Sequence, residues 1–394
     1  RRCLYLSYVG QSIRDNTPLP PSVLVSELLD VVDRSFQRPD GGRPREQLVT
    51  RHPLQAFSRR YFGGDDRWFS YARELIEASR QAGRGERDPA PLLAAELLEP
   101  EPTLRRVTLE SLVGFFRNPA RWLLRERLGI RPDEGEEELE TREPFVLDGL
   151  ANHQLLGRML ELHRDGRIAA EIRAVARGSG ALPHGQVGDC VFVQAQNRVA
   201  RFAGRLGRVL PRRDPEPMDL ELKLGEFELS GRLTGMTPAG RVGYRLASIK
   251  ANDYLKLWLY HLVLNVAAPT DVTLQSRWVA EDKEIVLEPG DAAAAHLRVV
   301  LEWYWRGTRR LLHFFPRSAL AYVETLRKSK DQDVDKALWA ARRQWEGGDF
   351  QRLAPERENV YYRLAFRDTD PLDDEFVEMA TAMFAPIFEA QSQG

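Results

Sequence analysis

One stretch, residues 229–262, constrains the fold of this chain more than any other. It reads LSGRLTGMTPAGRVGYRLASIKANDYLKLWLYHL. Residues 226–236 and 240–250 are expected to be strands, and Pro238-Ala239-Gly240 predicts a hairpin turn between them. From Asn252, a good helix N-cap, apolar residues recur with helical periodicity. The order strand, turn, strand, helix predicts an α/β fold.

The flanking sequence predicts helices on both sides of this unit. The opening RRCLYLSYVG is expected to be a buried inner strand, and Ser22 is expected to cap a helix that follows it. Asn118-Pro119 should separate two helices, because Pro is favoured at the first helical position. Residues 218–224 alternate in polarity like a half-buried strand. Further helices are predicted at about 148–164, 168–177 and 186–210 and from Asp291 to the end.

Composition limits the classes of protein to which the chain can belong. With 394 residues, 43% hydrophobic and 29% charged, it fits a soluble globular protein. It has no apolar run of roughly 20 residues, so we expect no membrane contact. Cys3 and Cys190 are too few for a disulfide framework or a four-thiolate cluster, which favours the reducing cytoplasm. The first residues show neither a methionine nor a signal peptide, so we expect a segment of a longer protein.

The strand–turn–strand–helix unit resembles the core of PD-(D/E)XK nucleases. In those enzymes one strand carries Asp, the next carries Asp/Glu-x-Lys, and a helix follows. Two carboxylates hold a divalent cation against the scissile phosphate, and the lysine orients the attacking water. The residue types at these positions therefore decide whether such a site is active.

The RecB-like branch of these nucleases has Gly-x-Ile/Leu-Asp, then Asp-x-Lys, then Gln-x-x-x-Tyr on the helix. This chain is similar, with Gly231-Arg232-Leu233-Thr234, Ser248-Ile249-Lys250 and Lys256-Leu257-Trp258-Leu259-Tyr260. The glycine, lysine and tyrosine are kept, but both carboxylates and the glutamine are replaced. We therefore predict no catalytic residues, no metal and no cofactor, and a vestigial site made of Thr234, Ser248, Lys250, Lys256 and Tyr260.

Two other carboxylates lie near these motifs in the sequence. Asp253 follows Lys250 by three residues, where a negative charge in the first turn of a helix is favourable. Glu228 lies six residues before Thr234, about 20 Å along a strand, which is too far to share a metal. Neither is expected to restore the site.

The opening of the chain shows a comparable loss. Superfamily 1 helicases end their second motor domain with a strand of the type R-R-L-L-Y-V-A-L-T-R-A, whose last Arg reaches the nucleotide phosphate. Residues 1–11, RRCLYLSYVGQ, are similar, but Val9-Gly10 replaces the Thr-Arg pair. The order is thus a degenerate helicase strand followed by a degenerate nuclease unit.

That combination resembles the RecC family, the gamma subunit of exodeoxyribonuclease V (RecBCD). LYLSYVGQSIRDNTPLPPSVLVSELLD, EPFVLDGLANHQL and LPHGQVGD add to the likeness, which covers most of the chain apart from loops at 37–105 and 133–143. The resemblance implies a helicase-like tail and linker over 1–104. Over 105–394 it implies an inactive PD-(D/E)XK nuclease-like domain, a mixed sheet flanked by helices with extra helices. The related AddB family keeps a live nuclease and iron–sulfur cysteines, which this chain lacks.

The resemblance also implies partners and a role. The family's C-terminal region contacts RecD, resembles the RecB nuclease domain, and helps split duplex DNA and route a single strand in double-strand break repair. Two alternatives stay open: an active metal-dependent nuclease with a rearranged site, and a protein-interaction module without DNA contact.

Net charge is −1, so any DNA contact must be local. Arginines recur every three to four residues and then at position 212, which indicates a basic stripe along a helix. The stripe is either a phosphate-binding face or a solvated or protein-contacting one, and comprises Arg198, Arg201, Arg205, Arg208 and Arg212. Trp303, Tyr304, Trp305 and Trp345 are either core residues or stacking platforms for bases.

Overall fold

The strands of residues 229–250 form as predicted, but they belong to different sheets. In the computed structural model, β3 (Phe227–Leu233) is the central strand of one sheet and β5 (Gly240–Arg245) lies inside another. The predicted hairpin is present and short, because only β4 (Met236–Thr237) pairs with β5 across its turn. The chain thus leaves the first sheet at Thr234 and Gly235.

The structure describes residues 3–12, 17–65, 67–81, 92–93, 95–132, 146–212, 214–348, 354–367 and 369–392. Arg1, Arg2, Arg213 and the loop 133–143 lie outside these ranges. The chain divides into two units, residues 1–90 and residues 91–394. Across the described ranges, no helix combines the length and the apolar character that a bilayer crossing requires.

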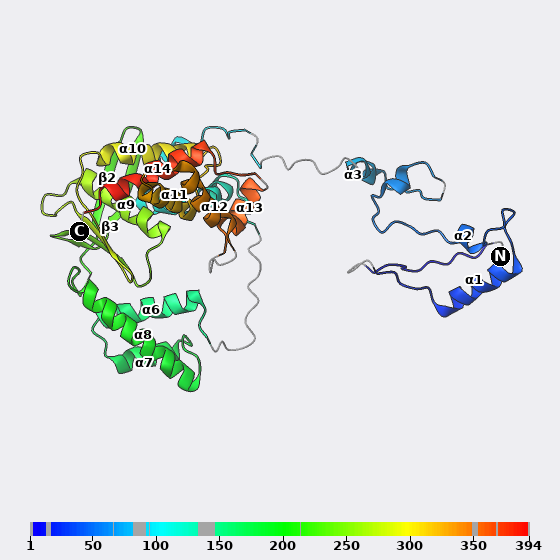
Figure 1. The fold of residues 1–394 in the computed structure, drawn as a ribbon, viewed down its shortest axis with the longest axis horizontal. Helices are drawn as coiled ribbons and strands as arrows, with labels where there is room; N and C mark the ends of the chain where they lie inside the picture. Colours follow the sequence, from blue (N-terminus) through cyan, green and yellow to red (C-terminus); the bar gives the residue numbers. More distant parts are fainter. Residues whose placement is uncertain are drawn as a thin grey trace. The chain divides into compact units, whose positions relative to one another are not determined.

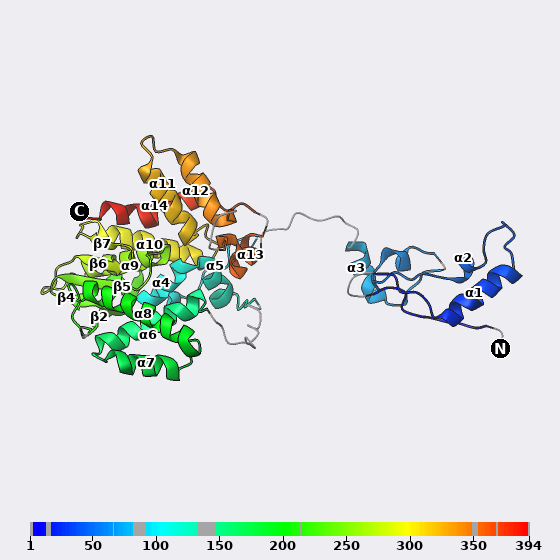
Figure 2. The same ribbon diagram turned by 60° about the horizontal axis from the view of Figure 1, so that its bottom comes forward.

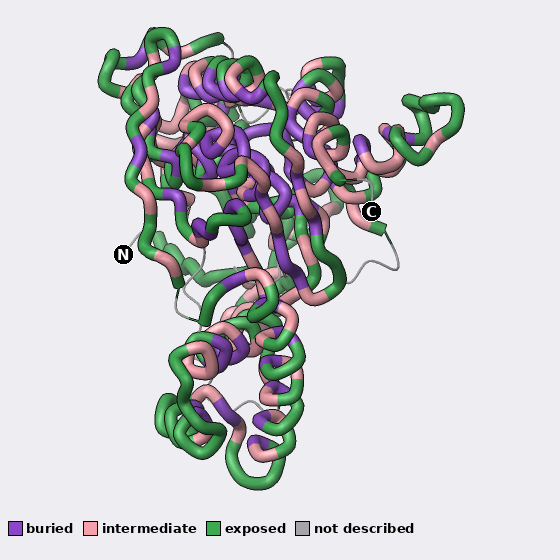
Figure 3. Tube along the Cα trace, turned by 90° about the vertical axis from the view of Figure 1, so that its left-hand side faces the viewer, coloured by how far each residue is buried: buried purple, intermediate pink, exposed green. Residues whose placement is uncertain are grey.

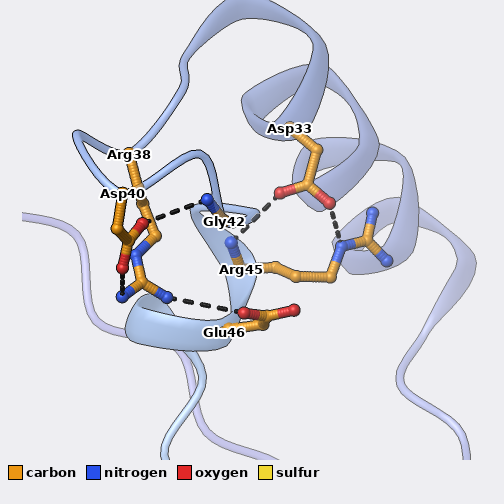
Figure 4. Close-up of polar contacts among 6 residues, drawn as sticks. All are labelled: Asp33, Arg38, Asp40, Gly42, Arg45 and Glu46. Carbon is orange, nitrogen blue, oxygen red and sulfur yellow. Dashed lines mark hydrogen bonds and ion pairs between the residues drawn. The ribbon is translucent and has the colours of Figure 1, made fainter.

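Among its described residues, the first unit has the α-helices α1 (Val23–Ser35), α2 (Arg45–Leu48) and α3 (Ile76–Gln81), and short 3-10 helices at Arg59–Phe62 and Arg73–Leu75. Ser22 caps α1 as predicted, since its hydroxyl accepts from the Val25 N–H at 3.4 Å. Ion pairs hold the first two helices together (Figure 4): Asp33 at the end of α1 accepts from the Arg45 backbone N–H at 3.0 Å and pairs with its side chain. Arg38 in the connecting loop joins Asp40 and Glu46.

The expectation of a buried strand at the opening is wrong for this structure. Residues 3–10 are extended and exposed, and none of them pairs with a strand in the described part of the chain. Leu4 and Tyr5 expose 76% and 83% of their surface. A buried inner strand needs neighbours on both edges, and among the described residues of this unit Ser79 is the only buried one.

The described residues of the second unit form two mixed sheets (Figures 1 and 2). In the first, β3 pairs in parallel with β1 (Arg106–Thr108) and antiparallel with β2 (Met218–Leu224), which is half-buried as predicted. In the second, β5 pairs in parallel with β6 (Ser276–Ala280), and β6 pairs antiparallel with β7 (Glu284–Leu287). A mixed α/β architecture is therefore confirmed.

The second sheet is covered by helices on both faces. Val242 and Val279 pack into one core with α6 (Gly149–Arg164), α7 (Ala169–Gly178) and α8 (Gly185–Leu206). Trp278 and Ala280 pack into the other, larger core around α9 (Ala251–Ala267). In Figure 3, buried segments run through the second unit and along the helices at the bottom of the view, which are α6–α8. Successive residues of β5 therefore alternate between the α8 side and the α9 side.

Residues 109–132 and the C-terminal third add the helices that complete the larger core. The predicted break at Asn118-Pro119 is confirmed, and the Asn118 side chain accepts from the Arg121 N–H at 2.8 Å. The helices are α4 (Leu109–Arg117), α5 (Pro119–Trp122), α10 (Ala293–Gly307), α11 (Pro316–Lys328), α12 (Val334–Glu346), α13 (Val360–Phe366) and α14 (Asp374–Glu389).

Candidate functional site

Thr234, Ser248 and Lys250, three residues of the vestigial site, lie at the ends of elements or in the connection between them. Thr234 directly follows β3, Ser248 lies in the connection from β5 to α9, and Lys250 is the N-cap residue of α9. All three are exposed. The prediction that Asn252 is the N-cap of this helix is wrong, because the N-cap is Lys250, two residues earlier.

Asp253 explains where the helix begins. Its carboxylate accepts from the Lys250 backbone N–H at 2.8 Å, and it also accepts from the Arg245 guanidinium at 2.8 Å. The Arg245 and Asp253 side chains are only 23% and 11% exposed, so the pair is shielded from solvent. The carboxylate thus serves the first turn of α9, as the sequence indicated, and neutralises a neighbouring cation.

A second carboxylate, Asp282, reaches the same connection from the β6–β7 turn. It accepts from the Ile249 N–H at 2.9 Å. Asp253 and Asp282 therefore both contact backbone groups beside Lys250, and in the described ranges no carboxylate forms an ion pair with the Lys250 ammonium. Sequence reasoning missed Asp282, because it lies more than 30 positions along the chain from Ile249.

The α9-facing side of β5 carries cations. Arg241 is buried, and its guanidinium carbon lies 4.1 Å from the centroid of the Tyr260 ring. Two residues on, Gly243 leaves room for the Trp278 ring, since a Cβ there would lie 2.6 Å from it. Arg245 completes the alternation and reaches Asp253. This face of β5 therefore presents two guanidinium groups to α9.

Lys256 and Tyr260, one turn apart on α9, bring the vestigial helix motif into the same cluster. The Lys256 ammonium lies 5.6 Å from the Tyr260 ring centroid. Burial lowers the pKa of Lys256, and the nearby cations Arg241 and Arg117 lower it further. Burial also raises the pKa of Tyr260, with a further contribution from the negative charge of Glu110.

Glu110 and Arg117 lie seven residues apart on α4, which places them on one helix face, and sequence reasoning missed both. Burial lowers the pKa of Arg241 itself to about 10, with Tyr260 acting in the opposite direction. The Nε and Nη1 atoms of Arg241 have no hydrogen-bond partner. The interior beside α9 therefore contains a positive charge that forms no ion pair with a carboxylate of the described residues.

These donors do not fit a divalent cation. Mg²⁺ requires hard, mostly anionic oxygens in near-octahedral geometry. Thr234 and Ser248 offer neutral hydroxyls, and Asp253 is already paired with Arg245. Within the described residues, no group of three or more His, Cys, Asp or Glu side chains is placed to hold a metal ion.

The predicted basic stripe divides into two sets. Arg198 forms a two-pronged ion pair with Glu281, at 2.9 and 2.7 Å, and Arg205 donates to the carbonyls of Glu281 and Ala280. These two arginines attach α8 to the β6–β7 turn. Helix α8 ends at Leu206, so Arg208 and Arg212 lie beyond it, and they are exposed together with Arg201.

Comparison with known proteins identifies the family of this chain. Residues 104–327, more than half of the chain, match the RecC C-terminal domain family. The chain belongs to that family.

Its curated relatives are much longer proteins. The RecBCD enzyme subunit RecC of Escherichia coli (strain K12) is 28% identical over 411 aligned positions, covering 98% of this chain and 35% of the relative. The same-named subunit of Haemophilus influenzae is 25% identical over 76% of this chain, and that of Mycobacterium tuberculosis (H37Rv) is 28% identical over 68%. The chain thus spans about a third of the length of the Escherichia coli relative.

Proposed function

We propose that this chain is a non-catalytic, nuclease-like part of exodeoxyribonuclease V, the RecBCD enzyme of double-strand break repair. In this role it contacts RecB and RecD in the cytoplasm and helps to split duplex DNA and route the single strands. Residues 105–394 form the PD-(D/E)XK-like domain, and residues 1–104 are the helicase-like tail and linker. Membership of the RecC C-terminal domain family supports this assignment.

One observation carries the non-catalytic part of the proposal. At the two positions where the nuclease core needs carboxylates, this chain has Thr234 and Ser248, and the adjoining interior holds the unpaired cation of Arg241. A phosphodiesterase site of this type needs a concentrated negative charge to bind its metal. Neutral hydroxyls beside a fixed positive charge create an electrostatic potential that disfavours binding of a divalent cation.

The alternative of a rearranged nuclease is favoured only by Asp253 and Asp282, whose carboxylates lie at the backbone of residues 249–250. Both carboxylates accept hydrogen bonds from the protein, and Asp253 also pairs with Arg245. A metal would have to displace these partners to bind there.

A labelled DNA fork with single-stranded arms tests the proposal. The 394-residue chain is titrated into the fork at several salt concentrations, and the same mixtures with Mg²⁺ or Mn²⁺ are run on a denaturing gel. A strand guide binds with an affinity that falls as salt rises, because bound cations are released, and leaves the DNA intact. Cleavage would assign the chain to live nucleases, and absence of binding at low salt would assign it to protein-interaction modules.

A further inference from the structure

A pocket of about 460 Å³ lies on the second unit, at the end of β3 opposite to Thr234. One wall is a face of α10 with Arg298, Glu302 and Trp305, and the other is the β2–β3 turn with Glu226 and Phe227. Arg105, at the end of a short 3-10 helix (Pro102–Arg105), closes one side. Its volume is in the range of small-molecule and nucleotide sites.

Trp305 differs from its aromatic neighbours. Trp303, Tyr304 and Trp345 are buried, so the sequence interpretation of core residues holds for those three. Trp305 is only partly buried and lines the pocket, with the Arg105 guanidinium 4.6 Å from its ring centroid. Phe227 packs edge-on against the same ring at 6.0 Å.

The guanidinium on Trp305 is fixed from several directions. Arg105 pairs with Glu226 in the pocket wall and with Glu99 at 3.7 Å. These contacts hold its guanidinium over the indole ring, so the pocket wall carries a preformed cation–π pair. Planar guanidinium groups and aromatic rings are the surfaces on which unpaired bases stack.

The charge of the lining favours an anion. Four arginines line the pocket, Arg105, Arg298, Arg306 and Arg309, against two glutamates, Glu226 and Glu302. Arg298 and Arg306 are exposed, and no ion pair to either is found in the described parts of the chain. Arg309 pairs with Glu96 at 3.2 Å, but its Nε atom is buried without a hydrogen-bond partner.

We propose that this pocket binds a nucleotide of a single DNA strand. The base stacks on the Arg105–Trp305 pair, and Arg298 and Arg306 bind the flanking phosphodiesters, for which the guanidinium fork is the best-matched side chain. The choice of DNA as the ligand rests on the proposed strand-guiding function. The inference adds that this pocket is one place where the chain contacts the strand.

The test uses the 394-residue chain and a fluorescein-labelled fifteen-nucleotide oligothymidine, measured by anisotropy. The variant R298E/R306E should lose about tenfold or more in affinity, and its salt dependence should become shallower by about two phosphate contacts. K330E/R363E changes the charge by the same amount at two exposed residues outside the pocket and should bind like the parent chain. The tryptophan fluorescence of the chain is also recorded as DNA is added. W305F keeps an aromatic ring in the pocket, and its fluorescence should be quenched less by DNA than that of the parent chain, because the contribution of Trp305 is gone.

Three results would overturn the inference. If R298E/R306E and K330E/R363E bind alike while the parent chain binds DNA, the pocket is not on the strand path, and the proposed function stands without it. If poly-glutamate displaces the oligothymidine at equal charge concentration, the pocket is an acidic-peptide site. If the parent chain binds neither the oligothymidine nor the fork, the strand-guiding function fails as a whole.

Discussion

The guanidinium of Arg241 stacks on the ring of Tyr260 at 4.1 Å inside the protein, and two of its nitrogen atoms have no hydrogen-bond partner. Burial of a charge is unfavourable unless partners compensate for it. The Tyr260 ring supplies an attraction of at most a few kcal/mol. Burial lowers the pKa of Arg241 to about 10. The arginine at this position therefore costs stability.

Replacing Arg241 with an uncharged side chain of similar length should stabilise the fold. We expect Arg241→Met to raise the free energy of unfolding by roughly 1–3 kcal/mol in urea titrations, because it removes an unpaired buried charge. Arg245→Met is the matched control on the same face of β5. It should lower stability, since it leaves the carboxylate of Asp253 without its cation. A loss of stability in both variants would show that Arg241 has a partner that compensates its charge.

His261 should make the fold sensitive to mild acid. It is buried in α9, contacts the Ser276 hydroxyl at 3.0 Å, and burial lowers its pKa to about 4, with the Glu288 backbone acting in the opposite direction. The unfolded chain binds a proton near pH 6.5, so stability is complete above that pH and falls as pH drops toward 4. The loss should reach about 3 kcal/mol. Urea titrations at pH 7, 5.5 and 4.5 measure it, and His261→Gln should remove this part of the pH dependence; an unchanged slope would exclude His261 as its source.

Gly235 should tolerate no side chain. It has φ +72°, and a Cβ there would lie 2.1 Å from the Val242 carbonyl oxygen, where the chain passes from β3 to β4. Gly235→Ala should cost roughly 2–3 kcal/mol. Gly180→Ala is the control, because Gly180 has φ +71° and nothing within 4 Å of its Cβ position. Equal losses in thermal unfolding of the two variants would mean that the close approach at Gly235 is easily relieved.

The exposed arginines Arg201, Arg208 and Arg212 should contribute to DNA binding. Arg198 and Arg205, which bind the β6–β7 turn, should contribute to stability instead. We expect R201E/R208E/R212E to weaken fork binding at least tenfold and to lower the salt slope by about three contacts. K330E/K336E/R363E carries the same change of charge at other exposed residues and should leave affinity unchanged.

Arg198→Gln should instead lower stability by roughly 0.5–1 kcal/mol, as expected for a partly exposed ion pair, with little effect on the fork. Fork affinity that drops for Arg198→Gln and stays constant for the exposed triple variant would reverse these assignments.

The sequence predicted features that depend on neighbouring residues. The Ser22 cap of α1 and the break at Asn118-Pro119 are both local hydrogen-bonding signals, and both are present. The start of α9 was misplaced because Asn252 is a strong capping residue in isolation, whereas Asp253 caps the helix from inside its first turn.

Features that depend on distant residues were not predictable. The stripe on α8 has the spacing of a solvated face, but Glu281, which binds Arg198, is 83 residues away. The sequence of β5 does not indicate that Arg241 is buried, because an arginine side chain is almost always exposed or paired. The opening residues show the same limit, since the pattern of an inner strand does not supply the neighbouring strands it requires.

Titration of Mn²⁺ into the 394-residue chain by calorimetry tests the central claim most directly, because Mn²⁺ occupies the same oxygen-ligand sites as Mg²⁺ and binds most of them more tightly. The account predicts no saturable heat, since Thr234 and Ser248 supply no anionic oxygen and Arg241 places a positive charge in the adjoining interior. A site with micromolar affinity that disappears in Asp253→Asn or Asp282→Asn would contradict it and show that the nuclease centre has been rebuilt from those two carboxylates.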